Sequence, residues 1–154
     1  MLNFKPVRFN EFSEIRLIRQ LSQPGVSEYN IVLHYGIVYA PGSNLKIIQE
    51  LVEGGSLLDA LKTHGRQHLS SQRLAQYAAQ ICQGLVYLRQ NQIIHRDLAA
   101  RNILLTQSLE RAKIGDFGLA ITMQEVETLP DDIDTLLRSK VAIKVSFLKY
   151  LKSI

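Results

Sequence analysis

The sequence predicts an α+β fold, and three observations lead to this prediction. Apolar residues recur at helical spacing over residues 71–90, which is typical of a long amphipathic helix. Two short runs at 31–39 and 45–51, rich in β-branched residues, flank a Pro-Gly-Ser-Asn turn, which is typical of paired strands. The predicted helices and strands do not alternate regularly, as they would in a parallel α/β sheet.

The composition excludes several classes of protein. With 154 residues, of which 46% are hydrophobic and 21% charged, the chain has the size and composition of one globular domain. The net charge of +4 is spread along the sequence, so we expect no nucleic-acid partner. No apolar run reaches the roughly 18 residues that a membrane span needs. The single cysteine, Cys82, allows no internal disulfide, and we expect a buried structural thiol in a cytoplasmic protein.

The first half of the chain predicts a helix, a pair of strands and a second helix. Phe12–Leu21 carries apolar residues on one face and ends before a Pro-Gly pair, so we expect a helix there. The two β-branched runs follow as the strands. Ser56 begins a Ser-x-x-Asp pattern with Asp59, which predicts a capped helix that continues to Lys62.

The second half predicts one long helix and a short hairpin. The helix over Ser71–Gln90 should bury one face, made of Leu74, Ala78, Ile81, Leu85 and Leu88. Ile103–Leu105 and Ala112–Ile114 are short apolar runs on either side of a polar loop, so we expect them to pair as a hairpin.

Two motifs after the long helix carry the chemistry. Residues 93–105 read IIHRDLAARNILL, which contains the H-R-D-L-x-x-x-N pattern of a kinase catalytic loop. Residues 113–120 read KIGDFGLA, which contains the D-F-G motif. Because both motifs occur in the right order with a hairpin between them, the chain resembles a protein kinase catalytic domain. This resemblance implies a partial kinase fold in four parts: an N-lobe remnant and hinge at 10–52, the catalytic-loop part of the C-lobe at 53–118, a degenerate activation segment at 119–145 and a tail at 146–154.

The resemblance implies a role for each polar residue of the two motifs. Asp97 would accept the proton of the substrate hydroxyl. Asn102 and Asp116 are hard oxygen ligands suited to Mg²⁺, which bridges the phosphates of ATP. His95 and Phe117 are expected to pack against each other in the core that links the two lobes.

The form of the catalytic loop narrows the substrate. HRDLAARN is the tyrosine-kinase form, because serine/threonine kinases usually carry a lysine where this chain has Ala99. Arg101 resembles the arginine that tyrosine kinases use instead, which implies a protein substrate with tyrosine. Together with the stretches GSLLDAL and YAAQICQGLVYL, the motifs look most like the Ack, or Cdc42-associated, group of cytoplasmic non-receptor kinases.

The resemblance also implies a nucleotide site. The stretch LKIIQELVEGGSLLDAL resembles the hinge of cytoplasmic tyrosine kinases, with Gln49 at the gatekeeper position. Glu50 and Val52 would offer backbone groups to adenine, and Leu104 would form part of the adenine floor. Glu14 matches the helix glutamate that pairs with the strand lysine of kinases. The alternative is that Glu14 is simply a solvent-exposed residue of the helix.

The resemblance spans about Asn10 to Val145 and lacks parts of a kinase. The residues before the first helix cannot hold three strands, a Gly-rich loop and the strand lysine. Val141–Lys144 spells the lysine motif V-A-I-K, but it follows D-F-G and lies in the register of the tyrosine-kinase segment K-V-P-I-R/K-W-x-A-P-E. We interpret it as a degraded substrate-binding segment. A circular permutation would need a Gly-rich loop just before it, and residues 128–139 contain no glycine.

Two functions from different classes follow. The first is an ATP- and Mg²⁺-dependent tyrosine kinase, of which residues 1–154 alone would show little activity because the lysine clamp and glycine loop are missing. The second is a catalytically inactive kinase-like fragment that acts as an interaction module. Because most of the C-lobe helices are also missing, we expect the apolar face of Ser71–Gln90 to stay partly unburied and to favour aggregation or a protein partner.

Overall fold

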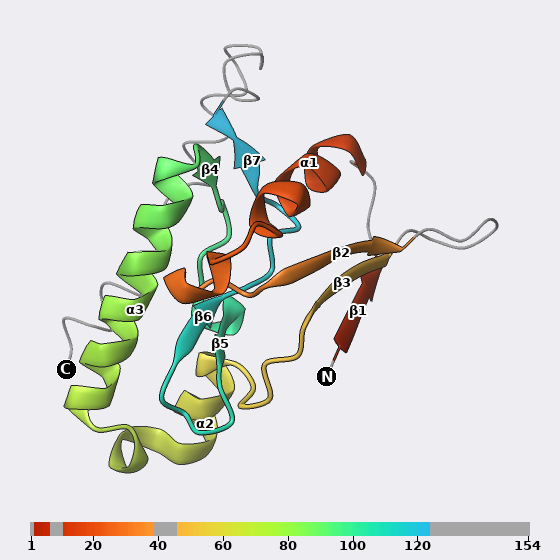
Figure 1. Cartoon of the computed structure of the whole chain (residues 1–154). Coiled ribbons are helices and arrows are strands. Elements are labelled where there is room, and N and C mark those ends of the chain that lie inside the picture. The colour runs from red at the N-terminus through yellow and green to blue at the C-terminus, as the bar shows by residue number, and fades with distance from the viewer. Residues whose placement is uncertain (1, 7–10, 39–45, 124–154) are drawn as a thin grey trace, which may run out of the picture.

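The fold is that of a computed structural model, which describes residues 2–6, 11–38 and 46–123. For residues 2–6, 11–15, 27 and 64–68 the backbone alone is described. The elements follow in the order β1 (Leu2–Pro6), α1 (Glu11–Leu21), the 3-10 helix η1 (Val26–Tyr29), β2 (His34–Val38), β3 (Lys46–Glu50), α2 (Leu57–His68), α3 (Ser71–Gln90), β4 (Ile93–Ile94), the 3-10 helix η2 (Ala100–Asn102), β5 (Ile103–Leu105), β6 (Ala112–Ile114) and β7 (Ile121–Thr122) (Figure 1). The expected α+β class is confirmed.

An antiparallel sheet with the strand order β1-β3-β2 lies at the N-terminal side of the structure, beside α1 (Figure 1). β2 and β3 are the two expected strands, both shorter than the apolar runs that predicted them. β1 was not expected, and the prediction that this part keeps two strands is therefore wrong. Lys5 of β1 lies opposite Ile47 of β3, and Gln49 lies between Asn3 and His34.

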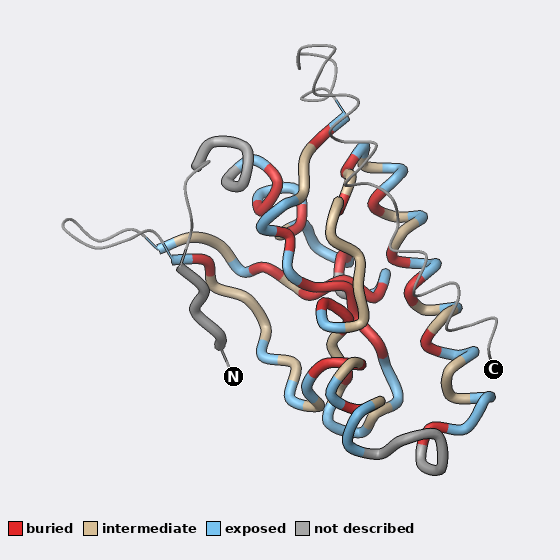
Figure 2. Tube along the Cα trace, turned by 180° about the vertical axis from the view of Figure 1, so that it is seen from behind, coloured by how far each residue is buried: buried red, intermediate tan, exposed pale blue. Residues whose placement is uncertain are grey.

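The main core forms where α1, α3 and the hairpin β5–β6 meet, as the buried residues at the centre of Figure 2 show. Leu21, Ile31 and Ile114 come from three distant parts of the sequence and are each fully buried. The segment before β2 is attached to β6 by backbone hydrogen bonds, from Ile114 N–H to Asn30 O at 2.8 Å and from Val32 N–H to Ile114 O at 2.9 Å. This attachment connects the small sheet to the hairpin.

α3 has the bounds that the sequence predicts, and the Ser70 hydroxyl caps it by accepting the Arg73 N–H at 3.2 Å. Its buried residues are Tyr77, Ile81, Gly84 and Leu88. The predicted face included two of these four, and its other members, Leu74, Ala78 and Leu85, are only half-buried. The buried stripe therefore only partly overlaps the predicted face. It includes Gly84, whose missing side chain lets Ile114 and Tyr29 approach the helix closely. The expectation that the apolar face is partly unburied is confirmed.

Three local predictions need correction. α2 continues to His68, well beyond Lys62, although its predicted cap is present, with Ser56 Oγ accepting the Asp59 N–H at 3.1 Å. Cys82 is exposed rather than buried, because it lies next to the buried stripe of α3 and not within it. β4 and β7 pair as an antiparallel two-stranded sheet that was not expected.

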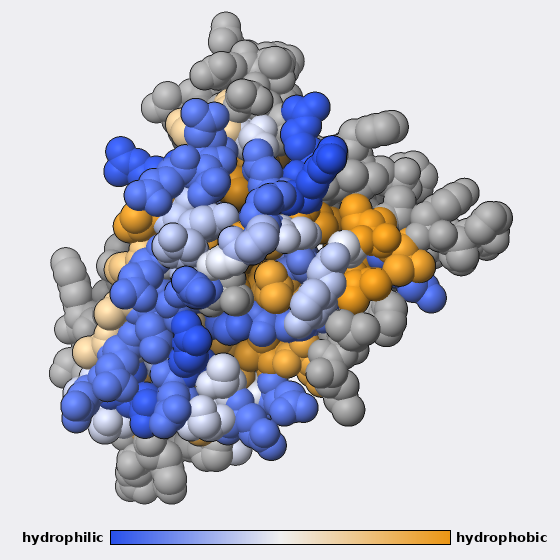
Figure 3. Space-filling view, in the orientation of Figure 1, coloured by the Kyte–Doolittle hydropathy of each residue, from blue (hydrophilic) through white to orange (hydrophobic). Residues whose placement is uncertain are grey.

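The face seen in Figure 3 is mainly hydrophilic over α3 and hydrophobic over part of the sheet of β2 and β3. Val38 at the end of β2 is 41% exposed, which agrees with this distribution. Within the described ranges, every helix is too short or too polar to cross a bilayer.

Candidate active site

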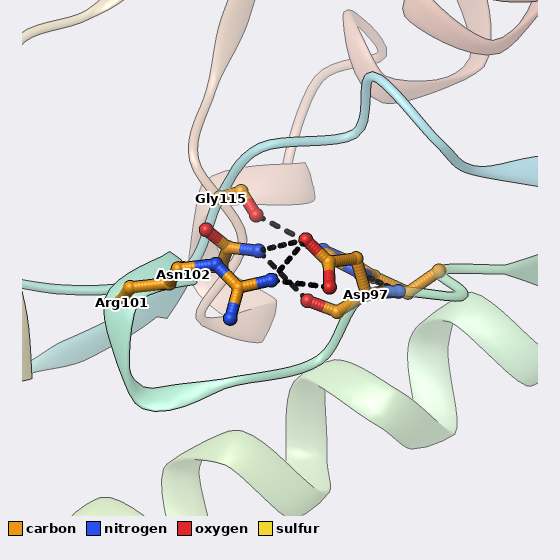
Figure 4. Close-up of polar contacts among 5 residues, drawn as sticks. Asp97, Arg101, Asn102 and Gly115 are labelled. Carbon is orange, nitrogen blue, oxygen red and sulfur yellow. Dashed lines mark hydrogen bonds and ion pairs between the residues drawn. The ribbon is translucent and has the colours of Figure 1, made fainter. Parts of the chain in front are cut away.

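The loop between β4 and η2 folds around Asp97 (Figure 4). The Asn102 side-chain amide donates to the Asp97 backbone oxygen at 2.7 Å and to its Oδ2 at 3.0 Å. Arg101 Nη2 donates to both carboxylate oxygens, at 2.5 and 2.6 Å. The three residues that the sequence singles out as catalytic therefore form one contiguous cluster.

The electrostatics of this cluster keep Asp97 charged. Partial burial alone would raise the pKa of the Asp97 carboxyl, but the hydrogen bonds from Arg101 and Asn102 outweigh it and lower the pKa. Asp97 is therefore a carboxylate at neutral pH, able to accept hydrogen bonds and a proton.

His95 is neutral and has a defined tautomer. Burial lowers the pKa of His95, and the Gly115 carbonyl and the carboxylates of Asp116 and Asp97 only partly offset this effect. Its Nε2–H donates to Gly115 O at 2.9 Å, and its Nδ1 accepts the Asp97 N–H at 3.3 Å. The ring thus links the catalytic loop to the residue just before Asp116.

The hairpin β5–β6 brings Asp116 back to the catalytic loop. Ile103 pairs with Ile114, and the Gly115 N–H donates to Asn102 O at 2.8 Å. Asp116 follows with a φ of 58°, a left-handed conformation that is uncommon for residues other than glycine and costs on the order of 1–3 kcal/mol. Such strain is typical of functional sites.

Phe117 lies between two histidine rings. It is 5% exposed, and its ring centroid lies 4.9 Å from that of His95 and 5.7 Å from that of His34. The predicted packing of His95 on Phe117 is confirmed. His34 is likewise buried, at 4% exposure.

The hinge segment, defined here as residues 51–55, begins directly after β3. The Glu50 N–H donates to Leu33 O at 2.9 Å, so Glu50 has only its carbonyl oxygen left to offer to adenine. Val52 and Gln49 are half-buried. The end of the hinge segment is fixed to β5, where Gly54 N–H donates to Leu105 O and Leu105 N–H donates to Gly55 O, both at 2.9 Å. Leu104 of β5 is half-buried beside this connection.

Two predictions concern residues that the structure describes only by their backbone or does not describe. Glu14 is in α1, where the backbone alone is described, so its pairing with a lysine stays a prediction. Val141–Lys144 and most of the expected activation segment lie outside the described residues.

Sequence reasoning missed Lys113. This residue lies in β6 at 7% exposure, and its Nζ is 2.5 and 2.7 Å from the two carboxylate oxygens of Glu50. The available signal was a lysine within a short apolar strand, which requires a buried partner.

Asn102 and Asp116 carry side-chain oxygens of the type that binds magnesium. The Asn102 amide nitrogen is used within the loop, which leaves its Oδ1 without a hydrogen bond among the described residues and open to a cation. The described part of the chain contains no cluster of three or more His, Cys, Asp or Glu side chains that could hold a metal. Magnesium in kinases needs few protein ligands, since phosphate and water oxygens complete its shell.

A neutral buried histidine and a charged aspartate lie on one loop, and the hairpin that follows this loop ends at an Asp-Phe-Gly turn, which is the arrangement of motifs found in protein kinases. The pattern of the family described as protein tyrosine and serine/threonine kinase matches residues 8–144, and the chain belongs to this family. The chain is 46% identical over 96 residues to the tyrosine-protein kinase csk-1 of Caenorhabditis elegans, covering 62% of this chain and 17% of the relative.

Two further relatives are also tyrosine kinases by name. The chain is 38% identical over 130 residues to tyrosine-protein kinase JAK1 of Danio rerio, covering 82% of this chain and 11% of the relative. It is 42% identical over 90 residues to the megakaryocyte-associated tyrosine-protein kinase of Rattus norvegicus, covering 58% of this chain and 17% of the relative. The chain thus spans less than a fifth of the length of these relatives. They support a tyrosine-kinase domain without confirming the Ack group.

Proposed function

We propose that this chain belongs to a cytoplasmic protein tyrosine kinase domain, which transfers the terminal phosphoryl group of ATP to a tyrosine hydroxyl of a protein. The observation that carries the proposal is the cluster of Asp97, Arg101 and Asn102 held beside Gly115-Asp116. Assignment to the Ack group rests on the sequence stretches quoted above and remains a prediction.

Asp97 is proposed to orient the substrate hydroxyl and to accept its proton. A carboxylate with a lowered pKa is a weak base, so its main contribution is to position the hydroxyl, with proton transfer late in the reaction. Arg101 is 45% exposed while it holds Asp97, so its guanidinium can also reach a substrate ring at the loop surface. A tyrosine hydroxyl approaching Asp97 would pass next to this side chain.

Asn102 and Asp116 are proposed to hold Mg²⁺. When bound, Mg²⁺ neutralises charge on the phosphates of ATP. The chain's own contribution is to fix both oxygen donors, since the Asn102 amide is held by Asp97 and the Asp116 backbone is held through Gly115.

The nucleotide base is proposed to lie against the hinge segment. The Glu50 carbonyl and the backbone of Val52 would bind adenine, Leu104 would contact its lower face, and Gln49 would border the pocket. The backbone of this region is held by β5 at one end and by Leu33 at the other.

β1 supplies a candidate for the lysine that the sequence was expected to lack. Kinases carry this lysine on the strand that leads into the glutamate-bearing helix. β1 leads into α1, and Lys5 occupies the register position opposite Ile47, two residues before Gln49. We therefore propose Lys5 as the phosphate-binding lysine of this chain, with Glu14 as its partner.

Nucleotide binding by purified residues 1–154 tests the proposal. Isothermal titration calorimetry should show ATP binding that is strengthened by Mg²⁺ in the parent and not in Asp116→Asn. Arg111→Met, which removes an exposed cation from the same hairpin, is the matched control and should bind like the parent. Transfer of labelled phosphate to a tyrosine-containing peptide should be slight and should disappear in Asp97→Asn. Absence of Mg²⁺-dependent ATP binding in the parent would leave the inactive interaction module as the better description.

A further inference from the structure

A buried ion pair connects two parts of the proposed site that are 63 positions apart in the sequence. The side chain of Lys113 is 8% exposed and that of Glu50 20% exposed, with both carboxylate oxygens within hydrogen-bond distance of Nζ. A buried pair of this kind is weak evidence for stability, because two well-packed apolar residues often stabilise a core equally well. What the pair provides is a fixed geometry between the two backbones that carry it.

The Glu50 end of the pair fixes the start of the hinge segment. Glu50 Oε1 also accepts the Leu33 N–H at 2.7 Å, while the Glu50 N–H donates to Leu33 O at 2.9 Å. One side chain thus joins the end of β3 and the loop before β2. The carbonyl of Glu50 and the hinge segment that follows are therefore held in a single arrangement.

The Lys113 end of the pair lies on the strand that carries the proposed metal ligand. Lys113 is in β6 between Ala112 and Ile114, which are both fully buried, and three positions before Asp116. The side chain belongs to a buried strand, paired with β5, that continues directly into the Asp-Phe-Gly turn. Neither Lys113 nor the Glu50 carboxylate is proposed to touch the nucleotide.

We propose that Lys113 is a positioning residue: through the Glu50 carboxylate it sets the hinge segment at the place where adenine binds and joins it to the strand that ends at Asp116. This inference rests on the proposed nucleotide site. It assigns to the pair an effect on ligand affinity that is separate from its effect on folding.

The test compares stability with affinity in Lys113→Met, Glu50→Gln and the double variant. The single variants leave one buried charge without its partner and should be clearly less stable than the parent, whereas the double variant removes both charges and should recover stability. Adenosine is the probe, because it reports on the hinge segment without phosphate or metal. Arg111→Met is the matched control, and Lys113→Arg tests whether a cation alone is sufficient.

The expected result is a loss of adenosine affinity of about tenfold in Lys113→Met, by analogy with the loss of metal affinity when a residue that supports a metal ligand is removed. The double variant should keep this loss although its unfolding midpoint returns toward the parent value. Lys113→Arg should restore part of the affinity, and Arg111→Met should bind like the parent. In Lys113→Met without ligand, the increase in amide hydrogen exchange over the parent should be larger at Leu33 and Glu50 than in the core of α3.

Two results would overturn the inference. Adenosine affinity that recovers together with stability in the double variant would show that the pair acts on folding alone. Adenosine affinity that is unchanged in every variant would also show that the ion pair does not position the hinge segment. A parent chain that binds no adenosine is a distinct outcome, because it removes the nucleotide site itself and refutes the proposed function along with this inference.

Discussion

Replacing Gly54 by alanine tests the connection between the hinge segment and β5. A Cβ at Gly54 would lie 2.5 Å from Leu105 O, 2.8 Å from the carbonyl carbon of Thr106, and also against Thr106 O. These are backbone atoms, so relief requires the two chains to separate. Gly54 N–H to Leu105 O and Leu105 N–H to Gly55 O are the hydrogen bonds that such a separation would break.

The magnitude follows from these contacts. Overpacking typically costs about 1–3 kcal/mol, and each of the two backbone hydrogen bonds contributes about 1 kcal/mol. Gly54→Ala should therefore lower the free energy of unfolding by about 3–5 kcal/mol. Gly55→Ala is the matched control, since a Cβ there meets nothing within 4 Å and only the φ of 74° is unfavourable. That strain costs about 1–2 kcal/mol.

Urea unfolding followed by far-UV circular dichroism gives both values. The expected order is parent, then Gly55→Ala, then Gly54→Ala, with about 1–4 kcal/mol between the two variants. If Gly54→Ala is no less stable than Gly55→Ala, the hinge segment does not pack on β5 as the structure shows, and the adenine floor assigned to Leu104 loses its support.

Further predictions concern the catalytic residues and pH. In a kinase chain that is complete in both lobes and carries this segment, Asp97→Asn should slow phosphoryl transfer with nearly unchanged nucleotide affinity, whereas Asp116→Asn should also weaken Mg²⁺–ATP binding. Single-turnover kinetics measures the transfer and calorimetry measures the binding. Equal effects of the two substitutions on both quantities would contradict the assigned roles. Lys5→Met should weaken ATP binding by residues 1–154 about tenfold or more and leave adenosine binding unchanged, and an equal loss of both ligands would count against a phosphate contact. Burial lowers the pKa of His95 below its ordinary value of 6.5. The contribution of the neutral, buried His95 to the free energy of unfolding is therefore complete above pH 6.5 and is lost as the pH falls through the lowered pKa. The lowered pKa of Asp97 likewise reduces stability on acidification, at a more acidic pH. Urea unfolding should therefore show a free energy of unfolding that falls with decreasing pH, and below pH 6.5 this fall should be less steep in His95→Gln than in the parent.

The parts of the fold that could be predicted are those with a strong local signal. α3 was predicted with its observed bounds because its apolar residues repeat over many turns and a serine caps its start. The hairpin β5–β6 was predicted because two apolar runs flank a polar loop. β7 has only two residues, and in β1 the alternation of Leu2 and Phe4 with Asn3 and Lys5 extends over too few residues to identify a strand.

The catalytic part of the site could be read from the sequence because it is almost entirely local. Asp97, Arg101 and Asn102 lie within one loop, and a fixed spacing of residue types is enough to identify them. The ion pair of Glu50 and Lys113 could not be found in this way, since no motif joins two residues so far apart. The exposure of Cys82 was missed for a related reason: which side of α3 is buried depends on how closely Gly84 approaches β6.

The difference between the local contacts of the catalytic loop and the long-range contacts of the nucleotide side affects what residues 1–154 can do on their own. The hydrogen bonds around Asp97 are formed within the described loop and hairpin, and none of those cited needs a residue beyond 123. The nucleotide side, in contrast, depends on long-range contacts from the β1–β3 sheet to β5 and β6. Phosphoryl transfer requires both sides to be positioned together. Variants that loosen the sheet should therefore reduce nucleotide binding before they disturb the hydrogen bonds of the catalytic loop, and amide exchange measured at Asn102 and at Glu50 in the same sample would reveal this order.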